Sequence, residues 1–145
     1  MHRLKSGLAA ALLLLGTCAG IAQTPGAESS LGGTSWRLIR FQGSDDTVLT
    51  PADPNKYAIA FGTDGRVAAR VDCNRGMGAW KSPGKSQLEL GPLALTRAIC
   101  PPASLNDRLV KDWTFIRSYI LKDGHLFLAL MADGGIYELE PLPGS

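Results

Sequence analysis

The sequence predicts an α+β fold that is mainly antiparallel β: a single curled sheet or cracked half-barrel of seven to eight strands, covered by one helix at about 103–117. Three observations predict it. Most apolar segments are short and alternate with the period of two that a strand requires. An Asp-Gly pair, which supplies the positive φ of a tight hairpin turn, recurs at Asp64-Gly65, Asp123-Gly124 and Asp133-Gly134. Only one segment spaces its apolar residues as a helix does.

The first strand is expected at 34–42, where strict alternation puts Phe41 on the face opposite Trp36 and Leu38. A turn of small residues is expected around Gly76 and Gly78. The other strands are expected at 57–61, 66–72, 78–81, 87–90, 119–121, 125–131 and 136–140, and residues 93–96 are expected to continue from 87–90 toward Cys100.

The helix is expected to follow Pro101-Pro102, because two prolines break a sheet. Ser104 is the candidate N-cap, since a serine hydroxyl can accept from the first free N–H groups of a helix. The apolar residues of this segment recur at helical spacing: Leu105, Leu109, Trp113 and Ile116.

The sequence predicts that the chain consists of three segments. Residues 1–22 have the features of a signal peptide, with Arg3 and Lys5 before a short apolar stretch and small residues before Gln23. Residues 23–31 are small and polar, as in a flexible tether, and residues 32–142 form the domain. The apolar stretch of the leader is too short to span a membrane, and no later segment could do so.

Cys18 leaves the form of the exported protein open. The residues Leu15-Gly16-Thr17-Cys18 are close to a bacterial lipoprotein box, although Thr17 is bulkier than the usual residue before the modified cysteine. The protein is therefore expected in the periplasm, with an outer-membrane lipoprotein as the alternative. Membrane contact is expected only through the leader or such an anchor.

Charge argues against a nucleic-acid partner. Of 15 basic residues, Arg3 and Lys5 belong to the leader, which leaves 13 basic against 13 acidic residues. These charges are scattered, whereas a nucleic-acid site needs a basic excess on one face.

Cys73 and Cys100 are the only cysteines expected in the mature chain, and an even number in an oxidising compartment predicts a disulfide. Two free thiols or a metal site are the alternatives. Zinc is disfavoured because the mature chain adds only His125 to the two cysteines, short of four ligands. We therefore expect no metal and no cofactor.

Five short motifs resemble the META domain family, which includes the HslJ-like heat-inducible proteins of bacterial envelopes: Trp36-Arg37-Leu38, Phe61 to Arg66, Cys73-Asn74-Arg75, Gly91 to Arg97 and the closing Cys100. The residues at the family's motif positions are Asn74, Arg75, Gly91, Pro92, Thr96 and Arg97. Asp72 stands where the family usually has glycine. The resemblance implies a small antiparallel sheet or cracked barrel with a helix, no established enzymatic activity, and roles in envelope stress, drug tolerance, secretion or virulence.

Two motif residues have alternative interpretations. Asn74 either closes a turn by bonding its own backbone or contacts a ligand, and the turn is the commoner use of asparagine. Arg97 either pairs with Asp72 or a backbone carbonyl across the disulfide, or contributes to an anionic ligand site.

Six large apolar residues are expected in the core, but some could instead line a cleft between sheet and helix: Trp36, Trp80, Leu109, Trp113, Leu126 and Leu128. An interior cavity there would favour a carrier of a lipid or small hydrophobic molecule. A filled interior would favour surface recognition of another envelope protein.

The first functional hypothesis is therefore a non-enzymatic exported envelope protein, monomeric, that acts as a stress-response or drug-tolerance accessory or binding domain. The carrier or sensor is the alternative. A hydrolase is the third class, and the sequence offers no nucleophile and base around His125 that would support it.

Overall fold

The structure, a computed structural model, describes residue 20 and residues 31–144. The rest of the expected leader, including Cys18, and residues 23–30 of the expected tether lie outside the described residues. The strands are β1 (Thr34–Gln42), β2 (Val48–Leu49), β3 (Tyr57–Phe61), β4 (Arg66–Val71), β5 (Asn74–Lys81), β6 (Glu89–Leu90), β7 (Ala94–Leu95), β8 (Ile116–Lys122), β9 (His125–Leu130) and β10 (Ile136–Pro141). The helices are α1 (Asn106–Asp112) and three 3₁₀ turns, η1 (Pro54–Lys56), η2 (Trp113–Phe115) and η3 (Met131–Asp133).

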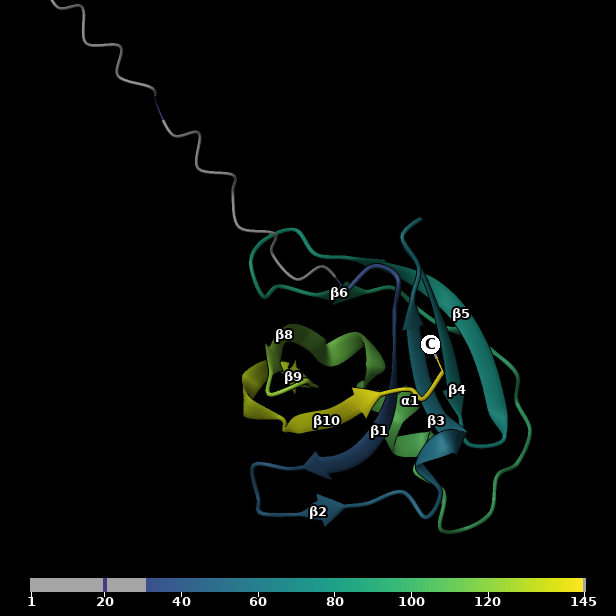
Figure 1. Ribbon diagram of the computed structural model, residues 1–145. Helices are drawn as coiled ribbons and strands as arrows, with labels where there is room; N and C mark the ends of the chain where they lie inside the picture. Colours follow the sequence, from purple (N-terminus) through teal and green to yellow (C-terminus); the bar gives the residue numbers. More distant parts are fainter. Residues whose placement is uncertain (1–19, 21–30, 145) are drawn as a thin grey trace, which may run out of the picture.

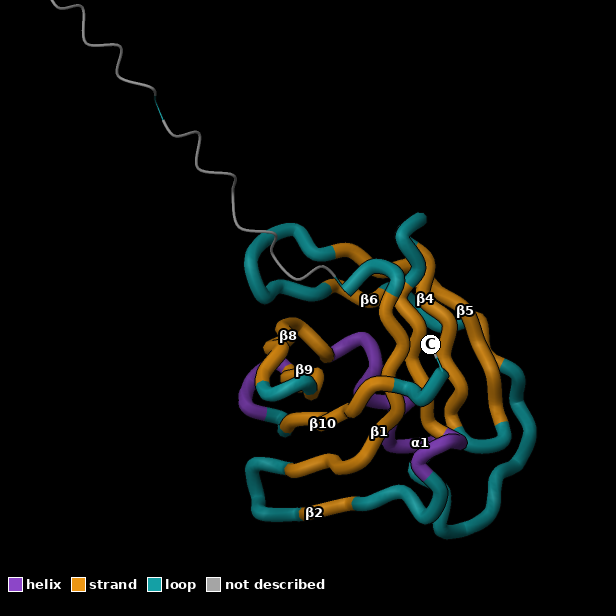
Figure 2. The backbone as a smooth tube through the Cα atoms, in the orientation of Figure 1, coloured by secondary structure: helices purple, strands orange, loops and turns teal. Residues whose placement is uncertain are grey.

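The strands form one antiparallel sheet in the order β6-β5-β4-β3-β1-β10-β9-β8, with β2 paired to β1 and β7 to β5. The sheet curls until its two ends meet (Figures 1 and 2). There the Leu88 N–H donates to the Arg117 carbonyl over 3.0 Å, and the Tyr119 N–H donates to the Ser86 carbonyl over 2.9 Å. The fold is therefore a nearly closed barrel with one seam and a single α-helix, which confirms the predicted fold class.

The first strand departs from strict alternation. The pairing of β1 with β10 shifts register between Leu38 and Arg40, so an extra residue is accommodated there. As a result Phe41 is 1% exposed and packs on Tyr137 with ring centroids 4.6 Å apart. The prediction that Phe41 lies opposite Trp36 and Leu38 was wrong, because a bulge reverses the side of every residue after it.

The expected turn at Gly76 and Gly78 is also wrong, since both glycines lie inside β5. The chain turns earlier, at Asp72 and Cys73, with Asp72 at a φ of 56°. The glycines are needed because another segment crosses close to β5. A Cβ on Gly76 would lie 2.8 Å from the Ala94 carbonyl oxygen.

The helix is shorter than expected. α1 begins at Asn106 and ends at Asp112, and the 3₁₀ turn η2 follows at Trp113 and leads into β8 at Ile116. The N-cap position is Leu105, not Ser104, although the Ser104 hydroxyl accepts from the Asn106 N–H over 3.1 Å. Trp113 is 2% exposed, so the 3₁₀ turn carries the largest apolar side chain of this segment into the core.

The core fills the inside of the barrel. Its fully buried side chains come from most strands and from the α1–η2 segment. Leu31, expected at the end of the tether, is 1% exposed, and its carbonyl accepts from the Thr34 N–H over 3.1 Å. The packed domain therefore includes Leu31.

Candidate functional site

The two cysteines close a loop at one corner of the barrel. Cys73 lies in the turn between β4 and β5, and Cys100 lies shortly before α1. They form a disulfide with a Cα–Cα distance of 5.5 Å across 27 residues of sequence. The predicted pairing is confirmed, and it ties the approach to the helix to the sheet.

Asn74 is the centre of this corner, with 2% of its surface exposed. Its Oδ1 accepts from the Thr96 hydroxyl over 2.9 Å and from the Ala98 N–H over 2.8 Å. Its Nδ2 donates to the Ala98 carbonyl over 3.0 Å and to Asn106 Oδ1 over 3.1 Å. These four bonds use the two donors and two acceptor positions of an amide. Asn74 is therefore a structural clamp between β5 and the start of α1, and it does not bond its own backbone.

Other motif residues also hold the fold. The Arg75 N–H donates to the Thr96 hydroxyl over 3.0 Å, and the Thr96 N–H returns a bond of 3.0 Å to the Arg75 carbonyl. The Gly91 carbonyl accepts from the Trp113 indole over 2.9 Å. Pro92 passes over Gly78, where a Cβ would lie 2.9 Å from the proline oxygen. Packing and hydrogen bonding thus account for Gly91, Pro92 and Thr96 and for the backbone of Arg75.

Arg97 stands apart from this network. Its side chain is exposed, and no ion pair among the described residues includes it or Asp72. The structure therefore lacks the Arg97–Asp72 salt bridge considered above. Arg97 borders an open hollow of about 410 Å³ together with Asn106, Asp107 and Val110.

Within the described part of the chain, the space found inside the barrel is too small for a ligand. Of the six residues that could line a cleft, five are buried and Trp80 is half-buried. The space found between α1 and the sheet, bordered by Leu109 and Leu128, is only about 10 Å³. A single water needs about 10–15 Å³, so a lipid would require the core to open.

One polar cluster lies inside. Asp112 Oδ2 accepts from Arg108 Nε over 2.6 Å and from the Tyr137 hydroxyl over 2.7 Å. Burial and the bond to Asp112 raise the pKa of Tyr137 far above its usual value, so the phenol stays a neutral donor. The bond to Asp112 also raises the pKa of Arg108. The cluster anchors α1 to β10.

His125 belongs to a surface ion-pair group. Its Nδ1 lies 2.8 Å from Glu138 Oε1, and Glu138 Oε2 lies 2.6 Å from an Arg40 guanidinium nitrogen. The bond to His125, followed by the charge of Arg40, lowers the pKa of Glu138. Within the described part of the chain, no three His, Cys, Asp or Glu side chains gather as metal ligands would.

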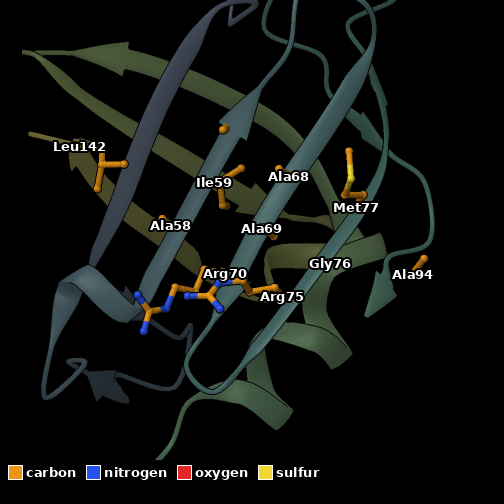
Figure 3. A pocket seen from close by; sticks show the side chains of 11 residues that line it. Ala58, Ile59, Ala68, Ala69, Arg70, Arg75, Gly76, Met77, Ala94 and Leu142 are labelled. Carbon is orange, nitrogen blue, oxygen red and sulfur yellow. The ribbon is translucent and has the colours of Figure 1, made fainter. Parts of the chain in front are cut away.

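The outer face of β3, β4 and β5 carries a wide open hollow of about 500 Å³ (Figure 3). Small, apolar and basic side chains line it, including Ala58, Ala60, Ala68, Arg70, Arg75 and Met77. Leu142 stands on one side of this hollow and Met77 on the other, while both arginines lie at the same end. The term outer hollow is used below for this site.

The outer hollow was missed by reasoning from the sequence, although part of its signal was visible. Alternation in β3 buries Tyr57, Ile59 and Phe61, which places Ala58 and Ala60 on the outside. The sequence does not show which residues of β4 and β5 lie opposite one another. Only the pairing of β4 with β5 shows that Arg70 lies directly opposite Arg75.

No carboxylate neutralises this arginine pair. Neither Arg70 nor Arg75 belongs to an ion pair between described residues. The polar bond recorded for the Arg70 side chain is a long one, 3.4 Å from Nε to the Asp72 carbonyl oxygen. Like charges directly opposite each other on paired strands are destabilising. Ion pairing within the described part of the chain therefore does not explain why two arginines stand here.

None of the described helices has the length and apolar character that crossing a membrane would need. The chain thus folds as a small antiparallel barrel with one α-helix, and a disulfide closes one corner of the barrel. The META domain matches residues 29–139, and the chain belongs to the META domain family.

Two solved structures share the fold. A protein from Burkholderia xenovorans, solved by NMR, aligns with a TM-score of 0.67 and 20% identity over 99% of this chain and 98% of its own. A crystal structure of a DUF4847 family protein from Bacteroides vulgatus aligns with a TM-score of 0.60 and 14% identity over 83% of this chain and 100% of its own. A search of the curated proteins gave no match.

Proposed function

We propose that this META domain protein is a non-enzymatic binding domain of the bacterial envelope, exported to the periplasm, that recognises its partner on its outer surface. An accessory role in stress response or drug tolerance is the context that the family resemblance implies. The observation that carries the proposal is the contrast between a filled interior, with about 10 Å³ of space, and an outer hollow of about 500 Å³.

The disulfide supports export. Such bonds persist in the periplasm and are rare in the reducing cytosol. The Cys73–Cys100 bond is partly open to solvent, because Cys73 is exposed, so a reducing compartment would have access to it. The leader at 1–22 is the independent sequence feature that supports the same compartment.

The polar groups inside the barrel and at its corner support a role without catalysis. The Tyr137 hydroxyl donates to Asp112, and the Asn74 amide donates to Asn106, and these two bonds fix the helix on the barrel. A nucleophile needs a base within hydrogen-bond reach, and among the described residues the His125 ring bonds to Glu138 and to no serine, threonine or cysteine. The interior carrier is disfavoured, since its site would have to displace packed side chains.

The test is mass spectrometry of the protein purified from its own cells under non-reducing conditions. We expect it in the envelope fraction, either cut before Gln23 or lipidated at Cys18. Its mass should be two hydrogens below that of the dithiol, and native spectra should show a bound partner or ligand. A full-length cytosolic protein with three free thiols, at Cys18, Cys73 and Cys100, would contradict the proposal.

A further inference from the structure

We propose that the outer hollow binds an amphipathic carboxylate, with the carboxylate between Arg70 and Arg75 and the apolar body over Ala58, Ala60 and Ala68. This inference rests on the proposed binding function and names the ligand class for it.

The pairing of β3, β4 and β5 places a basic row of residues next to an apolar row, as such a ligand requires. One cross-strand row joins Ala58 on β3, Arg70 on β4 and Arg75 on β5. The next row on the same face joins three apolar residues, Ala60, Ala68 and Met77. The two rows are about 7 Å apart, because a strand rises about 3.4 Å per residue. A head group on the first row therefore leaves its apolar body directly over the second.

The alanines create the space. Side chains on the solvent face of a sheet are usually longer, and alanine is depleted from strands because it packs little there. Here Ala60 and Ala68 are paired with each other, and Ala68 is exposed. Leu142 and Met77 lie on opposite sides of the outer hollow (Figure 3). The short alanine side chains therefore form its base, and larger apolar side chains border it. Met77 is 52% exposed and offers a flexible apolar surface to a ligand.

The head group is fixed by the arginine pair. Residues directly opposite on antiparallel strands have Cα atoms about 4.5–5.5 Å apart, so one carboxylate can reach both guanidinium groups. A planar guanidinium matches a carboxylate with two parallel bonds. Binding an anion would also remove the repulsion between Arg70 and Arg75, which no carboxylate of the described chain offsets.

A carboxylate fits this site better than a phosphate. Phosphate sites in proteins draw on free backbone N–H groups at helix ends or in nests. The backbone of β4 is instead paired with β3 on one side and with β5 on the other. The donors that face the outer hollow are thus the two guanidinium groups, and each of them can place two parallel N–H bonds on a carboxylate.

The probe for the test is decanoate, used below the concentration at which it forms micelles, with the oxidised protein. Calorimetry should give saturable binding to one site. Amide NMR shifts should concentrate at Ala58, Ala60, Ala68 and Met77. Acetate, which lacks the apolar body, and decanol, which lacks the charge, should each bind at least tenfold more weakly. Decyl phosphate should also bind more weakly than decanoate.

Three variants locate the site. Arg70→Gln and Arg75→Gln should each weaken decanoate binding about tenfold, and Ala68→Phe should block it by filling the outer hollow. The matched control is Arg66→Gln, because Arg66 is an exposed arginine on the outer face of β4 that does not line the outer hollow. The Arg66→Gln variant should bind decanoate with the same affinity as the unchanged protein.

A merely structural role for the arginines predicts something different. It would make Arg75→Gln less stable without changing decanoate affinity. That result would overturn the proposal, as would absence of saturable binding, equal binding of decanol, tighter binding of decyl phosphate, or shifts confined to another surface. If the exported protein carries a different bound molecule elsewhere, this inference fails while the proposed envelope function stands.

Discussion

The two faces of β3 and β4 differ in what explains them. On the inner face Ile59, Phe61, Val67 and Val71 are at most 4% exposed, and each fits its neighbours in a filled core. On the outer face the same strands carry three alanines and two arginines, Arg66 and Arg70, and Arg70 lies opposite Arg75 of β5. Burying one large apolar side chain contributes about 1.5–3 kcal/mol, so folding accounts for the inner face. The outer face gains little from packing and includes a repulsive pair.

The difference teaches where to look for function in a small barrel of this kind. Residues whose replacement lowers stability are explained by the fold, and this includes the motif residue Asn74. Residues that stability does not explain are candidates for recognition. The predictions below therefore ask which residues the fold needs, from the largest expected effect to the smallest.

Phe61→Ala should have the largest effect, a loss of about 3–5 kcal/mol in the free energy of unfolding, because it leaves a cavity in the core. Its neighbour on the opposite face provides the control: Ala60→Ser should change stability by less than about 0.5 kcal/mol. Urea unfolding followed by fluorescence measures both. Similar losses for the two variants would remove the distinction between the faces.

Replacing both cysteines by serine should lower stability by about 3 kcal/mol, since the bond restricts a long loop of the unfolded chain. The measurement is urea unfolding of the double variant beside the oxidised protein. A loss below about 1 kcal/mol would show that the corner is held by Asn74 and its partners without help from the disulfide.

Asn74→Ala should lower the free energy of unfolding by about 1–3 kcal/mol, because the N–H and carbonyl groups of Ala98 would lose their hydrogen bonds to the Asn74 amide. Arg97→Ala is the matched control from the same corner. Its side chain is exposed and outside every ion pair between described residues, so its effect should stay within about 0.5 kcal/mol. If Arg97→Ala proved the more damaging change, the description of Asn74 as the clamp would be wrong.

Glu138 gives a pH-dependent effect. Its pKa in the folded protein lies below the ordinary value of 4.5, so its stabilisation is present above that pH and is lost as the pH falls through the folded pKa. Glu138→Gln should therefore be less stable than the unchanged protein at pH 5.5, by roughly 0.5–1 kcal/mol for a partly exposed group. The difference in the free energy of unfolding between Glu138→Gln and the unchanged protein should become smaller below pH 4.5. Thermal unfolding from pH 3 to pH 6 tests it, and a gap independent of pH would contradict the assignment.

Local signals in the sequence were enough for the hairpins at Asp64-Gly65 and Asp123-Gly124, for the cysteine pair and for the presence of one amphipathic helix. The hairpin at Asp123-Gly124 follows from turn chemistry alone, with φ values of 52° and 77°. Features that depend on distant contacts could not be predicted. The bulge before Phe41 depends on pairing with β10, and Gly76 lies in a strand because the segment around Ala94 crosses it.

The candidate site shows the same limit. Asn74 was visible as a motif residue, but its role depends on partners at positions 96, 98 and 106. Arg70 and Arg75 lie five positions apart in sequence, and only the turn at Asp72 and Cys73 makes them neighbours across two strands. Composition does not show a register that places two arginines together, because the net charge of residues 23–145 is near zero.

The most direct test of the account is a double-mutant cycle of Arg70→Gln and Arg75→Gln, measured by urea unfolding of the free protein at low salt. We predict an unfavourable coupling of about 0.2–1 kcal/mol between the two arginines, so that either single variant is as stable as the unchanged protein or slightly more stable. A favourable coupling, with each single variant losing more than about 1 kcal/mol, would show that the outer face is built for stability and would contradict the account.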